Sequence, residues 1–399
     1  MSAPDVGGLA KDRFHLPEDV TYLDGNSLGP LTKDAALAIR SLTWDQWGQD
    51  LIRSWNKHDW FGAPERIGDR IAPLIGADKG EVVVADSVSV NIFKVAAAAL
   101  NARPGRTVIL SEPGNFPTDL YMIEGLKRLR PDVELRLVAR DEMVRALTDD
   151  VALLMLTHVH YRTAALFDMA ALTAAAHEAG ALTLWDLSHS VGAVPVDLNG
   201  AHADMAVGCG YKYLNGGPGA PAFLYVAARH QEAFASPLSG WMGHAAPFDF
   251  DDAYRPAAAM TRWRAGTPPM LALAALEAGV DVMRAADFGR VVAASRALTS
   301  AFVARVESEC ADMRLISPRD PVARGSHVSF AHDHAWEISQ ALIEAGVIGD
   351  FRTPDAIRFG FAPLYNDMVD VERAVSTLSE ILATGRWREA RFAARATVT

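Results

Sequence analysis

Residues 181–219 read ALTLWDLSHSVGAVPVDLNGAHADMAVGCGYKYLNGGPG and contain two short apolar runs, 182–185 and 205–208. Nearly continuous hydrophobic runs are typical of parallel strands that helices cover on both faces. Asp186 directly follows the first run, and Lys212 follows the second within four residues. Ligands of open parallel sheets bind beyond the carboxyl ends of the strands. We therefore expect Asp186 and Lys212 to face one crevice.

The same pattern continues on both sides of this segment. From about residue 81, runs rich in Val, Ile and Leu alternate with helix-like stretches at a spacing suited to β-α-β units. This predicts an α/β fold with a doubly wound, mainly parallel sheet of seven strands. The other five strands are predicted at 82–85, 107–110, 134–138, 152–156 and 222–226, and helices at 91–99, 118–129, 168–178, 268–286 and 290–306.

The pattern changes beyond about residue 306, where strand 327–330, helix 334–344, strand 357–361 and helix 367–383 predict a smaller α/β domain. We expect three parts. Residues 1–50 form an arm and helix that pack on the small domain or on a partner subunit, residues 51–305 form the large ligand-binding domain, and residues 306–399 form the small C-terminal domain.

Bulk composition excludes several classes of protein. The 38 Lys and Arg residues against 49 Asp and Glu give a formal charge of −11, which argues against a nucleic-acid partner. The N-terminal residues lack the pattern of a secretory signal, and no uncharged run is long enough to span a membrane. The only two cysteines, Cys209 and Cys310, give neither a disulfide framework nor a CxxC metal motif. We expect a cytoplasmic protein.

Asp186 and Lys212 together suit pyridoxal phosphate (PLP). The cofactor needs a carboxylate for its pyridine nitrogen and an amine that holds its aldehyde as a Schiff base. Taken singly, Asp186 is also explained as a cap or turn residue and Lys212 as a structural lysine. Segment 86–91, DSVSVN, offers small hydroxyl residues before a helix, which suits phosphate as well as ordinary capping. Phe116 suits stacking on the ring or packing in the core.

Seven blocks of the sequence resemble, in order, the kynureninase family of PLP enzymes, which have the aspartate-aminotransferase fold (fold type I). The resemblance spans residues 22 to about 366 and depends on the ordered set of blocks. These blocks are DSVSVNIFKV, EPGNFPTDLY, WDLSHSVGAVPVDL, CGYKYLNGGPG, PLSGWMGH, RGSHVSF and IRFGFAPLYN.

The resemblance implies a role for each matching residue. It implies that Lys212 carries PLP as a covalent Schiff base, that Asp186 pairs with the pyridine nitrogen, and that Tyr211 contacts the phosphate and donates a proton. Val88 and Ser89 would hold the phosphate, Phe116 would cover the ring, and Asp119 and His189 would line the pocket. Ser89 stands where many relatives have threonine, and Ala164 stands where the family usually has glycine.

The resemblance also implies a homodimer with active sites at the interface, in which Trp241 and Thr267 reach the cofactor of the neighbouring subunit. Arg358 would grip the substrate carboxylate, a role suited to a bidentate guanidinium. Trp55 and Thr267 occupy places that distinguish kynurenine from its 3-hydroxy form, and their identities favour kynurenine. No metal is implied.

The implied reaction is hydrolysis of L-kynurenine to anthranilate and L-alanine, in tryptophan degradation. Hydrolysis of 3-hydroxykynurenine to 3-hydroxyanthranilate stays open beside it. Lys212 would take the α-proton and Tyr211 would supply the acid. Three alternatives stay open. One is another PLP lyase of this fold, such as a cysteine desulfurase or selenocysteine lyase. The second is a metal enzyme that uses His158 and His160, and the third is a non-catalytic PLP-binding sensor module.

Overall fold

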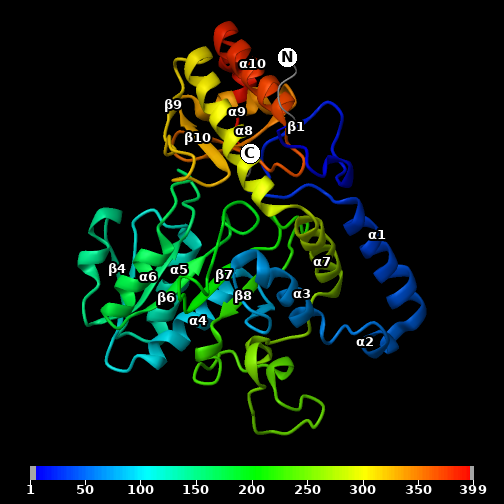
Figure 1. Cartoon of the computed structure of the whole chain (residues 1–399), viewed down its shortest axis with the longest axis vertical. Coiled ribbons are helices and arrows are strands. Elements are labelled where there is room, and N and C mark those ends of the chain that lie inside the picture. Colours follow the sequence, from blue (N-terminus) through cyan, green and yellow to red (C-terminus); the bar gives the residue numbers. More distant parts are fainter. Residues whose placement is uncertain (1–5, 396–399) are drawn as a thin grey trace.

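The computed structural model of the chain describes residues 6–395 and shows two α/β units, one above the other along the longest axis (Figure 1). Residues 1–5 and 396–399, which belong to the predicted arm and the predicted small domain, lie outside the described part. The large unit holds the central sheet, and the small unit holds the C-terminal helices (Figure 1).

The central sheet has seven strands, and all seven predicted strands are present. All neighbouring pairs are parallel except those of β8, which runs antiparallel to both β2 and β7. The predicted doubly wound, mainly parallel sheet is thus confirmed. The order across the sheet is β2 (Val82–Val84), β8 (Phe223–Val226), β7 (Met205–Gly208), β6 (Leu182–Asp186), β5 (Val151–Thr157), β3 (Val108–Ser111) and β4 (Glu134–Leu137).

Helices cover both faces of this sheet because successive strand residues point to opposite sides. Val82 belongs to a core shared with α3 (Ala63–Ile71), α6 (Met169–Glu178) and α7 (Met270–Ala285), whereas the adjacent Val83 belongs to the core shared with α4 (Val88–Ala102) and α5 (Pro117–Leu129). Both strand faces are therefore hydrophobic, as the continuous apolar runs indicate. Within residues 6–395, no helix is long and apolar enough to span a membrane.

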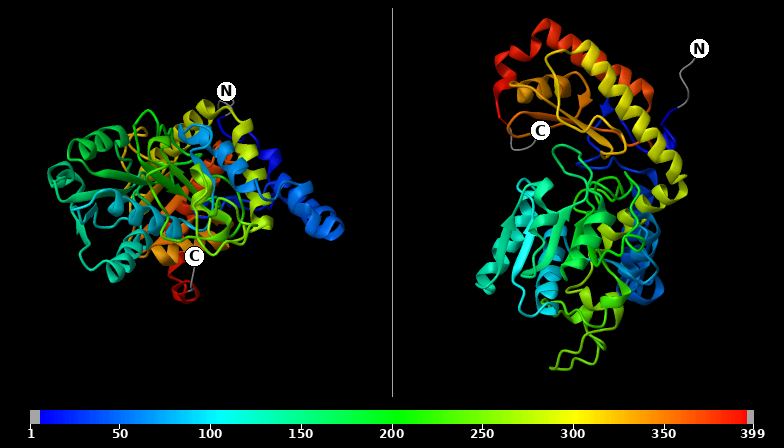
Figure 2. Two further views of the ribbon diagram at one scale, coloured as in Figure 1. Left: turned by 90° about the horizontal axis from the view of Figure 1, so that it is seen from below. Right: turned by 60° about the vertical axis from the view of Figure 1, so that its left-hand side comes forward.

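The small unit is an antiparallel four-stranded sheet with helices packed on it. Helix α8 (Phe288–Glu309) runs from the large unit into the small one (Figure 2), and its Leu298 and Phe302 belong to the small unit's core. The predicted boundary after residue 305 therefore falls inside a continuous helix. The remaining elements are β12 (Asp350–Arg352), β13 (Ala356–Gly360), β10 (His327–Ala331), β9 (Arg314–Leu315), α9 (Ala335–Glu344) and α10 (Met368–Thr384).

The N-terminal segment contacts both units. Strand β1 (Thr21–Tyr22) pairs in parallel with β11 (Val347–Ile348) of the small unit. Helix α1 (Lys33–Ser41) then lies beside α7 (Figure 1) and continues as a π-helical segment, Leu42–Asp50, before the short α2 (Ser54–Lys57). This long helical arm projects from the body of the molecule (Figure 2).

Candidate active site

A cavity of about 320 Å³ lies at the carboxyl ends of the parallel strands. Strands β5 and β6 end there at Thr157 and Asp186, and the loop after β7 adds Lys212. Helices α4 and α5 begin at its rim. Its lining consists of Ser87, Val88, Ser89, Phe116, Thr118, Asp119, Thr157, Asp186, Ser188, His189, Cys209, Tyr211, Lys212, Ala220 and Ala222. The structure thus brings eight of the predicted residues together, from Val88 to Lys212.

Lys212 meets a neutral histidine in this cavity. Its Nζ lies 3.0 Å from Nε2 of His189 and 5.9 Å from the centre of the Phe116 ring. Burial, followed by the charge of Lys212, lowers the pKa of His189 well below its usual range, so the imidazole is neutral and accepts the hydrogen bond. The N-terminal segment packs closely behind this loop, because a Cβ on Gly29 would collide with the carbonyl oxygen of Lys212.

Two buried carboxyl groups, those of Asp119 and Asp186, line the cavity. Asp186 Oδ1 accepts hydrogen bonds from the backbone N–H of Ser188 at 2.8 Å and from its hydroxyl at 2.6 Å. Burial and then the neighbouring Asp186 raise the pKa of Asp119 well above its usual range, and burial raises the pKa of Asp186 less completely, opposed by Ser188 and Lys212. The pair therefore favours one proton and one negative charge.

The first turn of α4 provides unpaired backbone N–H groups. The Ser87 side chain caps the helix by accepting from the N–H of Val90, and the N–H groups of Val88 and Ser89 lie at the positive end of the helix dipole. Behind this turn, the buried Lys94 donates to Asp86 at 2.7 Å and to the carbonyl of Trp263 at 2.7 Å. These two buried hydrogen bonds of Lys94 hold the first turn of α4 in place.

These features fit PLP. Asp119 Oδ1 is buried and has no hydrogen-bond partner among the described residues, and the carboxyl pair suits a protonated ring nitrogen. The turn at Val88 and Ser89 suits a phosphate. Lys212 supplies the amine, and Phe116, whose ring is 37% exposed at the rim, can cover the ring face.

Arg358 lies outside the cavity lining but next to it, at the junction of the two units. It is buried and makes four hydrogen bonds: two to Asp350, one to Ser27 Oγ at 3.0 Å and one to the carbonyl of Tyr161 at 2.6 Å. A guanidinium has five N–H donors, so one remains. The Tyr161 ring contacts Phe116 edge-on at 5.4 Å, which links this cluster to the cavity.

The structure does not bring three predicted residues to this chain's cavity. Trp241 is 42% exposed at the start of a protruding loop, and Thr267 is exposed before α7. Trp55 belongs to α2, at the far end of the helical arm (Figure 1), and packs edge-on against Trp60. None of the three residues lines this cavity.

The histidines of the metal alternative make other contacts. His158 bonds to Ser190 Oγ at 3.0 Å, His160 bonds to the Gly114 carbonyl at 2.9 Å, and burial lowers the pKa of both to about 4. In residues 6–395 no group of three or more His, Cys, Asp or Glu side chains is arranged to hold a metal ion.

Sequence reasoning missed several lining residues, among them Ser188, Thr157 and Cys209. Thr157 ends β5 as Asp186 ends β6, so the rule that placed Asp186 also applied to it. Ser188 stands two residues after Asp186, where a hydroxyl can bond to the carboxylate.

Comparisons with known proteins agree with this geometry. A family profile described as "Kynureninase C-terminal domain" matches residues 291–378. A kynureninase of Burkholderia pseudomallei strain 1106a is 52% identical over 98% of this chain and 95% of its own length, and one of Deinococcus radiodurans is 50% identical over 96% and 95%. The chain belongs to the kynureninase family. The predicted family is thus confirmed.

Solved structures show how widely the fold of this kynureninase family member is shared. The apo cysteine desulfurase of Thermococcus onnurineus NA1 has a TM-score of 0.82 at 18% identity and covers 96% of this chain and 100% of its own. A C-DES mutant with glycine covalently linked to its PLP cofactor has a TM-score of 0.80 at 16% identity and covers 93% and 99%. At such identities the likeness shows the fold alone.

Proposed function

We propose that the chain is a PLP-dependent kynureninase that hydrolyses L-kynurenine to anthranilate and L-alanine. The observation that carries this proposal is the placement of Lys212 beside neutral His189, in one cavity with Asp119 and Asp186. The chain is also 52% identical to a kynureninase over nearly its whole length.

The cavity residues hold and orient the cofactor. The N–H groups of Val88 and Ser89 would bind the phosphate, Asp186 would pair with the ring nitrogen, and Phe116 would cover the ring. When bound on Lys212, PLP supplies an electron sink next to the α-carbon of the substrate. Because the pKa of Asp119 is raised well above its usual range and that of Asp186 less so, Asp186 is the carboxylate that would balance a cationic ring.

Two side chains move protons. Lys212 takes the α-proton, and His189 Nε2, 3.0 Å from Nζ, is the neutral acceptor that steadies the amine. Tyr211 is the acid for the leaving alanyl carbon. Its pKa is raised above the usual phenolic range, first by the nearby Cys209 and then by burial, so the phenol keeps its proton at neutral pH.

Arg358 binds the substrate carboxylate. Its bonds to Asp350, Ser27 and Tyr161 use four of the five guanidinium N–H groups, and the fifth is free for the substrate. Asp350 fixes the plane of the guanidinium, which limits how the carboxylate docks. Trp55 and Thr267 select the aryl group, and their identities favour kynurenine over 3-hydroxykynurenine.

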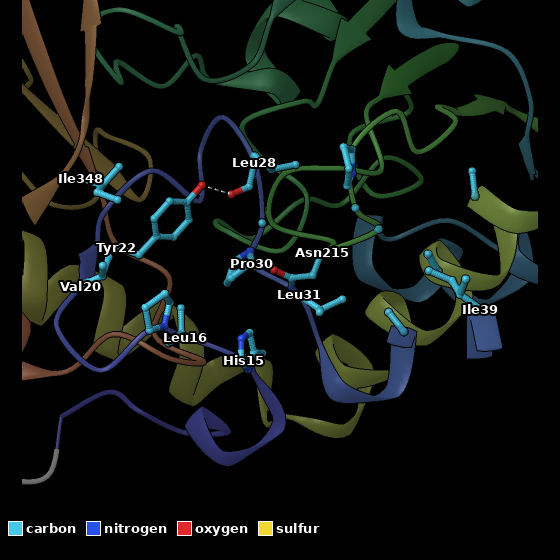
Figure 3. A pocket seen from close by; sticks show the side chains of 18 of the residues that line it. His15, Leu16, Val20, Tyr22, Leu28, Pro30, Leu31, Ile39, Asn215 and Ile348 are labelled. Atoms are coloured by element: carbon cyan, nitrogen blue, oxygen red, sulfur yellow. Dashed lines mark hydrogen bonds between the residues drawn. The ribbon is translucent and has the colours of Figure 1, made fainter. Parts of the chain in front are cut away.

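The enzyme acts as a homodimer whose two sites are completed across the interface. The support is an unusually apolar face: Leu37, Trp44, Leu51 and Ile52 of the arm are between 60% and 77% exposed. Beside the arm lies an apolar hollow of about 640 Å³, whose lining includes Leu28 and Leu31 near Asn215 and Ile39 farther along (Figure 3). A second copy of the chain would cover this face.

A cysteine desulfurase is the second candidate, because solved desulfurases share the fold. Desulfurases need a cysteine nucleophile on a mobile loop. Here Cys209 is a buried residue of the cavity lining and Cys310 is buried at the end of α8. Burial raises the pKa of both thiols, that of Cys310 to about 11. Neither thiol is set to accept sulfur.

Both cysteines are free thiols, which supports the proposed cytoplasmic location.

The deciding experiment mixes the PLP-loaded protein with L-kynurenine and follows absorbance and fluorescence. We expect a visible cofactor band, followed by anthranilate fluorescence, both lost in Lys212→Ala. A visible band without anthranilate fluorescence would support PLP binding but contradict the kynureninase activity. A parallel assay of sulfide and alanine released from cysteine then tests the desulfurase.

A further inference from the structure

Two buried histidines face one another where the large and small units meet. His189 belongs to the loop after β6, and His327 is the first residue of β10 in the small unit. Their ring centres are 5.3 Å apart and tilted by 53°, and the side chain of His327 is fully buried. His327 does not line the Lys212 cavity, so it reaches that site only through His189.

The hydrogen-bonding state of this pair is incomplete. Among the described residues, His189 Nδ1 and both ring nitrogens of His327 are buried without a hydrogen-bond partner. Because His189 Nε2 accepts the bond from Lys212, the proton of the neutral ring must be on Nδ1. A buried N–H that lacks an acceptor is strongly unfavourable, so this proton needs one.

The surroundings keep the His327 ring neutral and therefore able to accept a hydrogen bond. Burial lowers its pKa well below the usual range, and the next contribution, in the same direction, comes from Arg358. His160 and Lys212 also lower it, and only Asp350 opposes them. A neutral imidazole always presents one nitrogen with a free lone pair. His327 therefore offers a free acceptor nitrogen to His189 Nδ1, with the two ring centres 5.3 Å apart.

We propose that His327 is a positioning residue that accepts the Nδ1–H of His189, through a slight ring rotation or one bridging water, and so keeps the lone pair of Nε2 directed at Lys212. The proposal rests on the proposed function, because it gives His327 a part in the proton transfer of Lys212. In the other tautomer an N–H would face the lysine amine, and the acceptor that steadies the amine would be lost. The position of the small unit thus sets the protonation chemistry of the large unit.

The test uses the PLP-loaded enzyme with His327→Phe, which fills the space without a nitrogen, and His327→Gln, which keeps a donor and an acceptor. His332→Phe, in the loop after β10, is the matched control. Ring ¹⁵N spectra report the tautomer of His189, assigned through its loss in His189→Gln. Absorbance of the cofactor band against pH and the separate kcat and KM values are the second and third readouts.

We expect the wild-type His189 ring to carry its proton on Nδ1 and the His327→Phe ring to be a mixture of tautomers. The midpoint of the absorbance titration should move by about half a pH unit or more. The kcat should fall roughly tenfold with KM nearly unchanged, and His327→Gln should restore most of it. His332→Phe should match the wild type.

A wild-type spectrum that places the proton of His189 on Nε2 overturns the proposal. This measurement does not depend on whether any variant folds. So does a folded His327→Phe enzyme with unchanged tautomer and titration, whatever its thermal stability. If the wild type releases no anthranilate while the tautomer and the titration respond to His327, then the substrate assignment fails and the positioning role stands.

Discussion

Tyr211 and Tyr213 flank Lys212 but differ in their surroundings. Tyr211 lines the cavity, whereas Tyr213 is buried in an apolar cluster with Tyr365 and its hydroxyl has no partner among the described residues. Because only Tyr211 can donate a proton in the cavity, Tyr211→Phe should lower kcat about a hundredfold while PLP binding stays within a few-fold. Tyr213→Phe is the matched control and should turn over normally. Stopped-flow turnover and PLP titration measure both, and unaltered turnover in Tyr211→Phe would remove it from the mechanism.

Asp24 should oppose folding as the pH rises. Burial and then the nearby Asp350 raise its pKa from 3.8 to about 7, against the pull of Arg358 and Arg352. Because the folded state binds this proton more tightly than the unfolded state, its stabilising effect is complete below pH 4 and is lost as the pH rises through about 7. Asp24→Asn should therefore gain stability over the wild type between pH 4 and pH 7, by on the order of 3 kcal/mol.

Urea unfolding of both proteins at several pH values measures this gain. Asp19→Asn, at an exposed position of the same segment, is the control and should show no such trend. A constant difference between Asp24→Asn and the wild type across this range would contradict the prediction.

The sequence predicts some site residues better than others, for physical reasons. Asp186 and Lys212 follow apolar strands, and the carboxyl ends of parallel strands meet at one edge, so their proximity follows from local pattern. His327 has no such signal, because its contact with His189 depends on how two separately folded units pack. The buried Asp350–Arg358 pair has another origin, because the register of the neighbouring strands β12 and β13 places the two residues opposite one another.

At the level of elements, the loop after β5 turns at Ala164, which has a left-handed backbone with φ of +61°. The glycine that the family usually has at this position thus has a conformational reason. The fully buried Ala164 accepts a hydrogen bond from the N–H of Gly325 at 2.8 Å, which ties the loop to the small unit. The left-handed form is unfavourable for alanine by roughly 1–2 kcal/mol.

Ala164→Gly should consequently be nearly neutral, since relief of this strain offsets the lost methyl group and the added chain entropy. Ala176→Gly in α6 removes an equally buried methyl group from a regular helix and should destabilise the protein by about 1 kcal/mol or more. Ala164→Val should be worse than either, because a β-branched residue rarely adopts positive φ. Chemical unfolding of the three variants gives the comparison, and equal losses in the two glycine variants would argue against backbone strain.

The long elements were predictable and the short ones were not. Seven strands and the main helices carry clear apolar patterns. In α6, Asp168 caps the first turn and Gly180 follows the last turn with positive φ, both common signals of helix ends. Strands β1, β9, β11 and β12 have only two or three residues each, too few for any period to show. The π-helical extension Leu42–Asp50 has no distinct sequence signal, because its side chains equally suit an ordinary helix.

For the whole molecule, the sequence predicts two α/β units but not how they share a helix or a site. Helix α8 carries large-unit and small-unit residues in one continuous run, so hydrophobic periodicity shows no boundary there. The exposed row on the arm also has no explanation within one chain. A helix face that is apolar and exposed requires a partner surface, and a symmetric dimer supplies one from the same sequence.

The proposed dimer predicts the mass of the wild type in solution and the dissociation of variants with a charged residue on the apolar face of the arm. The wild type should run at twice 43.0 kDa, and the double variant Trp44→Glu/Trp47→Glu should run as a monomer with little activity. Leu129→Glu, at an exposed leucine on the far edge of the large unit, is the control and should stay dimeric and active. Light scattering with chromatography measures all three, and a wild-type monomer that is fully active would refute the dimer.

Mixing two inactive variants tests whether Trp241 serves the partner's site. Lys212→Ala lacks the reactive amine, and Trp241→Ala lacks the side chain that the proposal assigns to the neighbouring cavity. In a mixed dimer one cavity then combines an intact Lys212 with an intact Trp241 from the other chain. Random exchange of subunits makes half of the dimers mixed, each with one intact site, so activity should recover to about a quarter of the wild-type value. If Trp241 acts within its own chain, every cavity carries a defect and no activity returns, because no exchange of subunits can then place both side chains in one site.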